Sequence, residues 1–413
     1  MERKVGKYMA NESSLNSTPS SQRLHIGFFG MRNAGKSSVV NAILGQQLSI
    51  VSDHKGTTTD PVLKAMELLP LGPVMIIDTP GLDDEGELGE LRVKKSKQML
   101  NKTDLAVLVV DATLGLSKQD EEILQLFQEK KLPYLIVYNK CDLVDLSKVT
   151  RVEPSIGVSA TTGWQITELK ERMATLVPIE ESKLPIVSDL INPSDFVVLV
   201  VPIDKAAPKG RLILPQQQTI RDILEANATS IVVKEHELKE VLQTLGKKPK
   251  LVITDSQVFE KVSTDTPDDI MLTSFSILFA RYKGNLATAV KGVKVLDTLK
   301  DGDHILIAEG CTHHRQCDDI GTVKLPRWIK NYCKKEINFE FTQGTQFPED
   351  LSKYKLVVHC GGCTLNEKEM KYRISCAVDA GIPITNYGIL IAYMQGILKR
   401  SVQIFPSIAK ELE

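Results

Sequence analysis

Short apolar runs alternate with amphipathic stretches along the first part of the chain. Apolar runs of this kind predict buried strands, and apolar positions three or four residues apart between them predict helices. We expect strands at 24–29, 74–77, 105–110, 134–137 and 156–158, and helices at 36–44, 91–100 and 118–129. Strands and helices alternating at this spacing are typical of an α/β domain with a doubly wound, mostly parallel sheet.

Two further α/β blocks follow a stretch at 179–193, which we interpret as a linker because it contains prolines and has no clear periodicity. The expected strands of these blocks lie at 196–201, 230–233, 250–253, 304–308 and 355–358. The expected helices lie at 216–225, 237–245, 272–281 and 285–299, with a polar break at 262–269. The predicted organisation is a mobile leader at 1–22 followed by domains at 23–178, 182–268 and 269–413.

The composition is that of a globular protein that buries real cores, with 42% hydrophobic and 25% charged residues. The chain has 51 Lys plus Arg and 52 Asp plus Glu, so a surface dedicated to nucleic acid is not expected. No apolar stretch reaches the roughly 20 residues that span a bilayer, and residues 1–22 lack the apolar centre of a secretory signal. We therefore expect a cytoplasmic protein that binds neither nucleic acid nor membrane.

A glycine-rich turn separates the first predicted strand from the first predicted helix. Residues 30–37 read G-M-R-N-A-G-K-S, which fits the phosphate-binding pattern G-x-x-x-x-G-K-S in its required context. The glycines let backbone amides turn toward phosphates, the lysine adds a positive charge, and the serine hydroxyl is a magnesium ligand. The residues expected to contact the nucleotide here are Gly30, Asn33, Ala34, Gly35, Lys36, Ser37 and Ser38.

Three more motifs, each at the end of a predicted strand, indicate that the nucleotide is GTP. The sequence D-T-P-G at 78–81 supplies a carboxylate for magnesium and a backbone amide for the terminal phosphate. In N-K-C-D at 139–142, the carboxylate can accept hydrogen bonds from a ring N–H and an amino group that guanine presents and adenine does not. The expected contact residues are Asp78, Gly81, Asn139, Lys140 and Asp142, with Ser159 and Ala160 in the turn after the fifth strand.

This first domain resembles the GTPases of the Era and tRNA-modification type. The resemblance implies that Thr58, or Thr57, in the sequence G-T-T-T-D is the switch threonine that binds magnesium. Leu82 stands where many GTPases carry a water-orienting glutamine. An aliphatic side chain cannot align water, so hydrolysis requires another device.

The same resemblance offers two such devices. One is an activating potassium ion bound by Asn33, and the other is an acid in the run 83–90, where spacing favours Glu90. A solvated acidic loop without a catalytic role remains the alternative for these acids. The residues expected to act in hydrolysis are Lys36, Thr58, Asp78 and Glu90.

Six of the seven cysteines lie after residue 310, which in a reducing compartment favours metal or cluster chemistry over disulfides. Cys311 and His313 form a C-x-H element, and His359, Cys360 and Cys363 form an H-C-x-x-C element. Three thiolates with histidines nearby suit either tetrahedral zinc or an iron-sulfur cluster. Buried thiols without a metal are the remaining interpretation.

A leading GTPase domain joined to these two cysteine elements resembles the HydF family, the maturation GTPases and scaffolds of iron-iron (FeFe) hydrogenase, from residue 23 onward. The resemblance implies a 4Fe-4S cluster held by Cys311, Cys360 and Cys363, with a fourth position open to exchange. It also implies a transient di-iron subcluster, apo FeFe-hydrogenase and radical-SAM maturases as partners, and a homodimer formed by 182–268. Candidates for the fourth or an outer position are His313, His359 and Asp318.

Two alternatives stay open at this point. One is a ribosome- or RNA-linked GTPase whose last domain is stapled by zinc, although residues 301–413 contain 14 Lys plus Arg and 14 Asp plus Glu and so have no basic excess. The other is a switch protein in which a metal only stabilises the last domain. An iron and sulfide determination separates both from a cluster scaffold.

Overall fold

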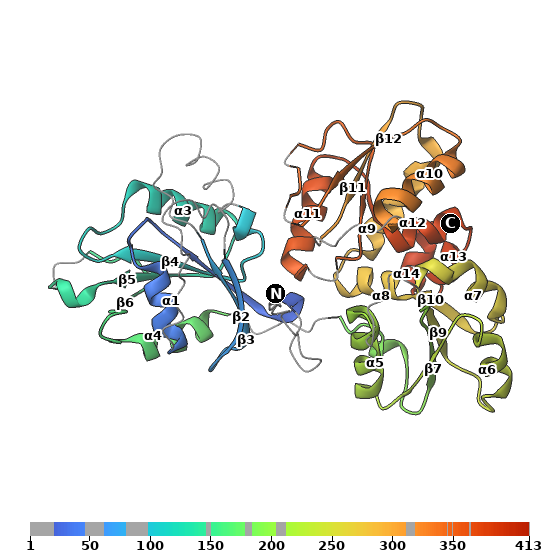
Figure 1. Cartoon of the computed structure of the whole chain (residues 1–413), viewed down its shortest axis with the longest axis horizontal. Coiled ribbons are helices and arrows are strands. Elements are labelled where there is room, and N and C mark those ends of the chain that lie inside the picture. The colour runs from blue at the N-terminus through green and yellow to red at the C-terminus, as the bar shows by residue number, and fades with distance from the viewer. Residues whose placement is uncertain are drawn as a thin grey trace, which may run out of the picture. The chain divides into compact units, whose positions relative to one another are not determined.

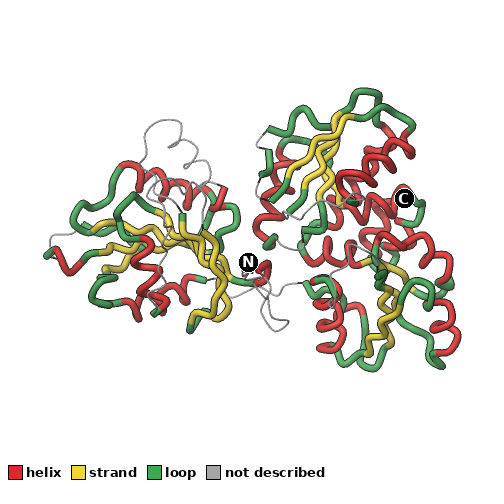
Figure 2. The backbone as a smooth tube through the Cα atoms, viewed as in Figure 1, coloured by secondary structure: helices red, strands yellow, loops and turns green. Residues whose placement is uncertain are grey.

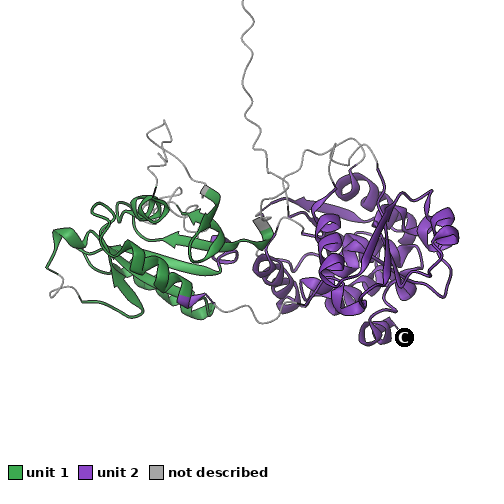
Figure 3. Ribbon diagram, turned by 90° about the horizontal axis from the view of Figure 1, so that it is seen from below, with its two compact units in different colours: residues 1–92, 104–174 green, residues 93–103, 175–413 purple. Residues whose placement is uncertain are grey.

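The structure is a computed structural model of the whole chain. It describes residues 20–45, 62–79, 98–145, 150–177, 184–203, 212–310, 319–344, 346–348, 350–362 and 365–412. The chain forms two compact units, which Figure 3 shows in different colours. The first contains residues 1–92 and 104–174, and the second contains residues 93–103 and 175–413.

The first unit is built on a six-stranded sheet in the order β2-β3-β1-β4-β5-β6. The strands are β1 (Leu24–Phe29), β2 (Val62–Leu68), β3 (Gly72–Asp78), β4 (Leu105–Asp111), β5 (Tyr134–Asn139) and β6 (Ser155–Gly157). All neighbours pair in parallel except β2 and β3. Helix α3 (Lys118–Glu129) covers one face, and α1 (Lys36–Leu44) and α4 (Ile166–Leu176) cover the other (Figure 1).

These elements confirm the predicted P-loop type of α/β fold and its five expected strands. The helices at 36–44 and 118–129 are found with the expected bounds, whereas only 98–100 of the helix expected at 91–100 lies in the described residues. The edge strand β2 was not predicted. Its sequence V-L-K-A-M-E-L mixes polar and apolar residues, and the alternate residues Leu63, Ala65 and Glu67, which share one face of the strand, are exposed.

The second unit contains two parallel four-stranded sheets, in the orders β10-β9-β7-β8 and β12-β11-β13-β14 (Figure 2). The strands of the first are β7 (Phe196–Val200), β8 (Thr229–Val233), β9 (Leu251–Thr254) and β10 (Met271–Ser274). The strands of the second are β11 (His304–Ala308), β12 (Asn338–Thr342), β13 (Leu356–His359) and β14 (Ile384–Asn386).

The helices of the second unit pack on both sheets, and all of those described but one contribute to one apolar core. They are α5 (Leu214–Glu225), α6 (Leu238–Thr244), α7 (Phe259–Asp265), α8 (Phe275–Tyr282), α9 (Leu286–Val293), α10 (Leu325–Cys333), α11 (Glu367–Asp379), α12 (Tyr387–Met394), α13 (Leu398–Ser401) and α14 (Pro406–Ala409). Side chains of α8, α9 and α12 join this core, while Ala377 of α11 packs in a second cluster with Leu306 and Val357. Helix α11 thus covers the opposite face of the last sheet.

Three expectations for this unit were wrong. The predicted polar break at 262–269 is occupied in its first half by α7, and the helix predicted at 272–281 begins as strand β10. Because β10 pairs with β9, the middle sheet continues past residue 268, where we had placed a domain boundary. The change from one sheet to the next falls between α8 and α9.

The apolar stretch near 384–398 forms β14 and the buried helix α12. Every side of α12 carries apolar residues, which a helix enclosed by its own protein requires. Among the residues that the structure describes, no helix is long and apolar enough to cross a membrane.

Gly292 allows α9 to lie directly on β14. A Cβ atom at this position would stand 2.2 Å from the backbone oxygen of Ile384 and 2.8 Å from its carbonyl carbon, so the helix would have to move. We expect Gly292→Ala to destabilise the second unit by about 1–3 kcal/mol. The midpoint of urea unfolding, compared with that of Lys291→Ala on the exposed side of the same helix, measures this effect; equal midpoints would show that the contact is not tight.

Candidate functional site

The phosphate-binding loop runs from β1 to α1 so close to its neighbours that glycine is required at both ends. Gly30 has φ +134° and Gly35 has φ +90°, a region that other residues rarely adopt. A Cβ atom on Gly30 would lie 2.2 Å from the carbonyl oxygen of Val109, and one on Gly35 would lie 2.2 Å from Nδ2 of Asn139. The backbone conformation of this loop is therefore fixed by the packing around it.

Lys36 and Ser37 begin helix α1 and lie beside the end of β3. The Lys36 Nζ atom donates to the carbonyl oxygens of Gly30 at 2.9 Å and Met31 at 2.8 Å, which holds the ammonium group at the loop. The Ser37 hydroxyl donates to Oδ2 of Asp78 at 2.8 Å. Burial raises the pKa of Asp78, while the hydroxyl of Ser37 and the charge of Lys36 act in the opposite direction. Two oxygens from neighbouring elements fit the ligand preference of Mg²⁺.

The side chain of Asn139, at the end of β5, joins the loops that the sequence assigns to phosphate and base. Its Nδ2 donates to the carbonyl oxygen of Ala34 at 3.1 Å, and its Oδ1 accepts from the amide of Ala160 at 3.1 Å. The Lys140 ammonium pairs with Asp111 at the end of β4. One buried amide therefore sets the spacing between the two ends of a nucleotide site.

The other predicted nucleotide contacts differ in exposure. Asp142, Asn33 and Ser38 are exposed, while Ser159 is fully buried and its hydroxyl oxygen accepts from the amide of Thr162. Asn33 has φ +62°. Outside the described residues lie Thr57, Thr58, Gly81, Leu82 and Glu90.

The strands that precede the two cysteine elements in the sequence, β11 and β13, are neighbours in the last sheet. Strands β11 and β13 pair with Ala308 opposite His359, and the Cys360 amide donates to the carbonyl oxygen of Ala308 at 2.9 Å. The Cys360 sulfur accepts from the amide of Gly310 at 3.1 Å and from that of Gly362 at 3.4 Å. Backbone N–H groups aimed at a sulfur favour its thiolate form, the form that binds metals.

Only part of the predicted metal site lies in the described residues. Outside them fall Cys311, His313, Asp318 and Cys363. Within them, no three His, Cys, Asp or Glu side chains are arranged to hold a metal ion. The chemistry of the donor at Cys360, a sulfur with two amide donors at a strand end, fits a thiolate ligand of an iron-sulfur cluster.

Two charged side chains beside Cys360 were not predicted. Glu309 precedes Gly310 and accepts from the hydroxyl of Tyr387 at 3.2 Å; burial and the charge of Asp319 raise the pKa of Glu309. The ammonium group of Lys283, a buried residue at the end of α8, donates to the carbonyl oxygen of Gly362. The sequence contains one indication that Glu309 belongs to this site, namely its position two residues before Cys311. It contains no such indication for Lys283.

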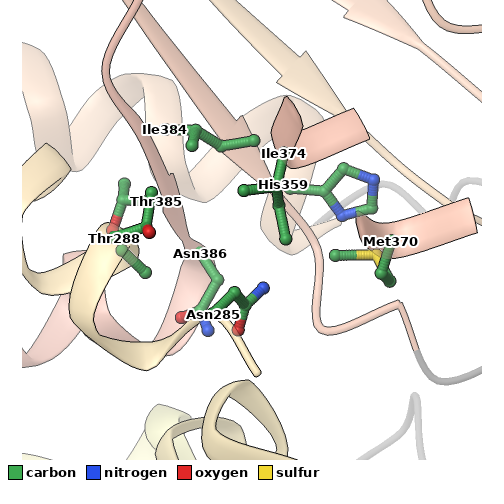
Figure 4. Close-up of a pocket in the computed structure, with 9 residues that line it drawn as sticks. Asn285, Thr288, His359, Met370, Ile374, Ile384, Thr385 and Asn386 are labelled. Carbon is green, nitrogen blue, oxygen red and sulfur yellow. The ribbon is translucent and has the colours of Figure 1, made fainter. Parts of the chain in front are cut away.

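His359 is 1% exposed and lies beside a small cavity at the ends of β13 and β14 (Figure 4). The cavity has a volume of about 10 Å³, which is room for one water molecule. Among the described residues, Oδ1 of Asn285 and Oγ1 of Thr385 line it without a hydrogen-bond partner. This cavity is too small for a nucleotide or a cluster.

Three family models match the chain, one mainly in the first compact unit and two within the second. Residues 25–140 match the family model of the 50S ribosome-binding GTPase, residues 186–284 that of the hydrogen maturase F (HydF) dimerization domain, and residues 287–404 that of the hydrogen maturase F tetramerization domain. The last two models together cover more than half of the chain.

The curated relatives match this chain through their GTPase homology. GTPase Der of Kosmotoga olearia is 30% identical over 46% of this chain and 47% of its own length, and tRNA modification GTPase MnmE of Desulforamulus reducens is 34% identical over 36% and 33%. The matched part of the chain thus spans less than half the length of each of these curated relatives. A structure of Aquifex aeolicus Era bound to GDP.AlF4- is 23% identical, with a TM-score of 0.34, over 54% of this chain and 98% of that one.

The phosphate loop, the pairing of Ser37 with Asp78 and the matched GTPase model identify the first unit as a GTPase domain. The Cys360 loop lies in the region matched by the tetramerization model of the maturases. The chain belongs to the HydF family of hydrogenase maturation proteins.

Proposed function

We propose that this protein hydrolyses GTP in its first unit and carries a 4Fe-4S cluster in its second, on which an immature di-iron subcluster is held for delivery to apo FeFe-hydrogenase. The observation that carries the cluster assignment is the Cys360 sulfur with two backbone N–H donors, at a strand end next to the one that leads into Cys311. Cys311 and Cys363 would supply the other thiolates.

The residues of the first unit have separate tasks in GTP hydrolysis. Lys36 supplies positive charge to the phosphates, and Ser37 and Asp78 hold Mg²⁺, with Thr58 as a further ligand. Bound Mg²⁺ neutralises the charge that develops on the phosphates. Asn139 keeps the phosphate loop and the base loop at a fixed spacing. Glu90 is our candidate for orienting the attacking water.

Guanine recognition is assigned to Asp142. Asp142 is exposed in the short 3-10 helix Cys141–Leu143 that follows β5, where its carboxylate can accept two hydrogen bonds from the base. We expect Asp142→Asn to weaken GTP binding by about 10- to 100-fold, since hydrogen bonds to a charged group are worth roughly 1.5–3 kcal/mol. Competition between GTP and ATP measures the selectivity, with the exposed Glu129→Gln as control. Unchanged GTP affinity in Asp142→Asn would refute the assignment.

Potassium is proposed as the second activator because Leu82 cannot orient water. Asn33 is exposed in the phosphate loop, where its side-chain oxygen can reach a monovalent cation near the phosphates. We expect faster GTP hydrolysis in potassium than in sodium buffer, and loss of this difference in Asn33→Ala. Equal rates of the unaltered protein in the two buffers would rule out the potassium site.

Self-association and partner binding are assigned to the second unit. The dimerization and tetramerization descriptions of the matched models support an oligomer built by 186–284 and 287–404. The homodimer expected from the sequence is one such assembly. Apo FeFe-hydrogenase and the radical-SAM maturases are the proposed partners. A light-scattering mass of one protomer would contradict the oligomer.

A further inference from the structure

The guanidinium group of Arg373, on α11, is fully buried and contacts His359, the first residue of the cysteine loop, which we define as residues 359–362. Its Nε and Nη2 atoms donate to Oε1 of Glu369 at 3.0 and 2.8 Å, and Nη2 also donates to the carbonyl oxygen of Gly344. Its Nη1 lies 3.0 Å from Nε2 of His359. The guanidinium carbon also lies 5.2 Å from the centre of the Phe347 ring. A buried cation with this many directed contacts holds one geometry.

These contacts select one tautomer of His359. An arginine side chain has no acceptor, so Nε2 of His359 accepts the hydrogen bond from Arg373 and carries no proton. A carbonyl oxygen has no donor, so Nδ1, which lies 2.7 Å from the carbonyl oxygen of Cys360, carries the proton. The imidazole therefore connects the guanidinium to the backbone of the cysteine itself.

We propose that Arg373 is a positioning residue for the cysteine loop, which holds His359 as its Nδ1–H tautomer and through it the Cys360 carbonyl group. Both ring nitrogens of His359 are then engaged, so this histidine holds the backbone of Cys360 and is not a ligand of the cluster. For Nε2 to bind iron, Arg373 would have to leave a buried N–H group without an acceptor, which is unfavourable. The functional meaning of this support rests on the proposed cluster at Cys360.

The loop carries a second restraint, from Lys283, the residue that directly follows α8. Its ammonium group donates to the carbonyl oxygens of Gly362 and, at 3.4 Å, Leu365, on the other side of Cys360 from His359 in the sequence. The cysteine loop is thus held at His359 by α11 and at Gly362 by α8. These hydrogen bonds of Lys283 do not involve His359. Removal of Arg373 should therefore release His359 and the Cys360 carbonyl group and leave Gly362 in place.

The tautomer can be measured on the full chain before any metal is added. In nitrogen-15 NMR of histidine-labelled protein, the His359 signal, assigned by its loss in His359→Gln, is expected to show a proton on Nδ1 and none on Nε2. Arg373→Met should turn this signal into a mixture of tautomers, while Arg327→Met on the exposed side of α10 should leave it unchanged. An Nε2–H tautomer in the unaltered protein, or an identical signal in Arg373→Met, would overturn the proposal.

Glu369→Gln is a second variant, which tests the proposal even if Arg373→Met does not fold. This substitution removes the ion pair and retains the contact between Arg373 and His359, so the Nδ1–H tautomer should persist; its loss would assign the restraint to the ion pair and overturn the proposal.

After reconstitution, Arg373→Met should retain iron and sulfide and change the electron paramagnetic resonance spectrum of the reduced protein. An unchanged spectrum would overturn the positioning role. Absence of iron from the unaltered protein would instead refute the proposed function, and the tautomer result would stand.

Discussion

Replacement of Lys36 by alanine is expected to lower the rate of GTP hydrolysis by about 10²–10³-fold, the effect of removing one preorganised donor from a charged transition state. The ammonium group of Lys36 lies 2.8–2.9 Å from two carbonyl oxygens of the phosphate loop, so its charge is already in place when the nucleotide binds. Phosphate release under saturating GTP and magnesium measures the change.

The matched control for Lys36→Ala is Lys118→Ala, which removes an exposed lysine from the start of α3 in the same unit. Binding of a fluorescent GTP analogue to both variants separates weak nucleotide binding from slow hydrolysis. A Lys36→Ala protein that turns over GTP as fast as the control would show that the phosphate loop is not the catalytic site.

The second large effect is expected in Cys360→Ser, which should lose the cluster. A serine hydroxyl is a hard and weakly acidic ligand, whereas iron in clusters requires soft thiolates. The amides of Gly310 and Gly362 that now face the sulfur cannot compensate for a missing ligand. The rate of GTP hydrolysis should be unchanged, because the described nucleotide-site residues all belong to the first unit.

Iron, sulfide and GTP turnover are measured on the same anaerobic preparations of Cys360→Ser. Cys333→Ser is the matched control, since this half-buried thiol ends α10 and lies outside both cysteine elements. Full iron and sulfide in Cys360→Ser would remove Cys360 from the ligand set. Loss of GTP hydrolysis together with the cluster would contradict our assignment of the two sites to different units of the chain.

Features with a strong local pattern were predicted well. The phosphate loop and α1 follow from glycines at fixed spacing after a strand, and β1, β4 and β11 are apolar runs whose ends the sequence marks clearly. Short or mixed strands were missed for a physical reason. Strand β14 has three residues, and β10 runs into α8 without a polar break, so neither shows a period of its own.

The two residues that hold the cysteine loop, Arg373 and Lys283, could not be identified from the local sequence pattern. Arg373 lies in the sequence E-K-E-M-K-Y-R, which indicates the charged face of an exposed helix. It is buried because His359 of β13, the carbonyl group of Gly344 in the loop after β12 and the ring of Phe347 lie against it. Likewise, Lys283 gains its role from a loop 79 residues away in the chain. Contacts between distant segments therefore determine which charged residues belong to the site.

The cluster assignment is tested most directly by anaerobic reconstitution of the full chain, followed by iron, sulfide and zinc analysis and electron paramagnetic resonance of the reduced protein. We predict about four irons and about four acid-labile sulfides per chain, the content of one cubane cluster, and a paramagnetic signal after reduction. About one zinc per chain with no iron or sulfide would contradict the cluster and would leave a GTPase whose last domain is stabilised by a metal staple.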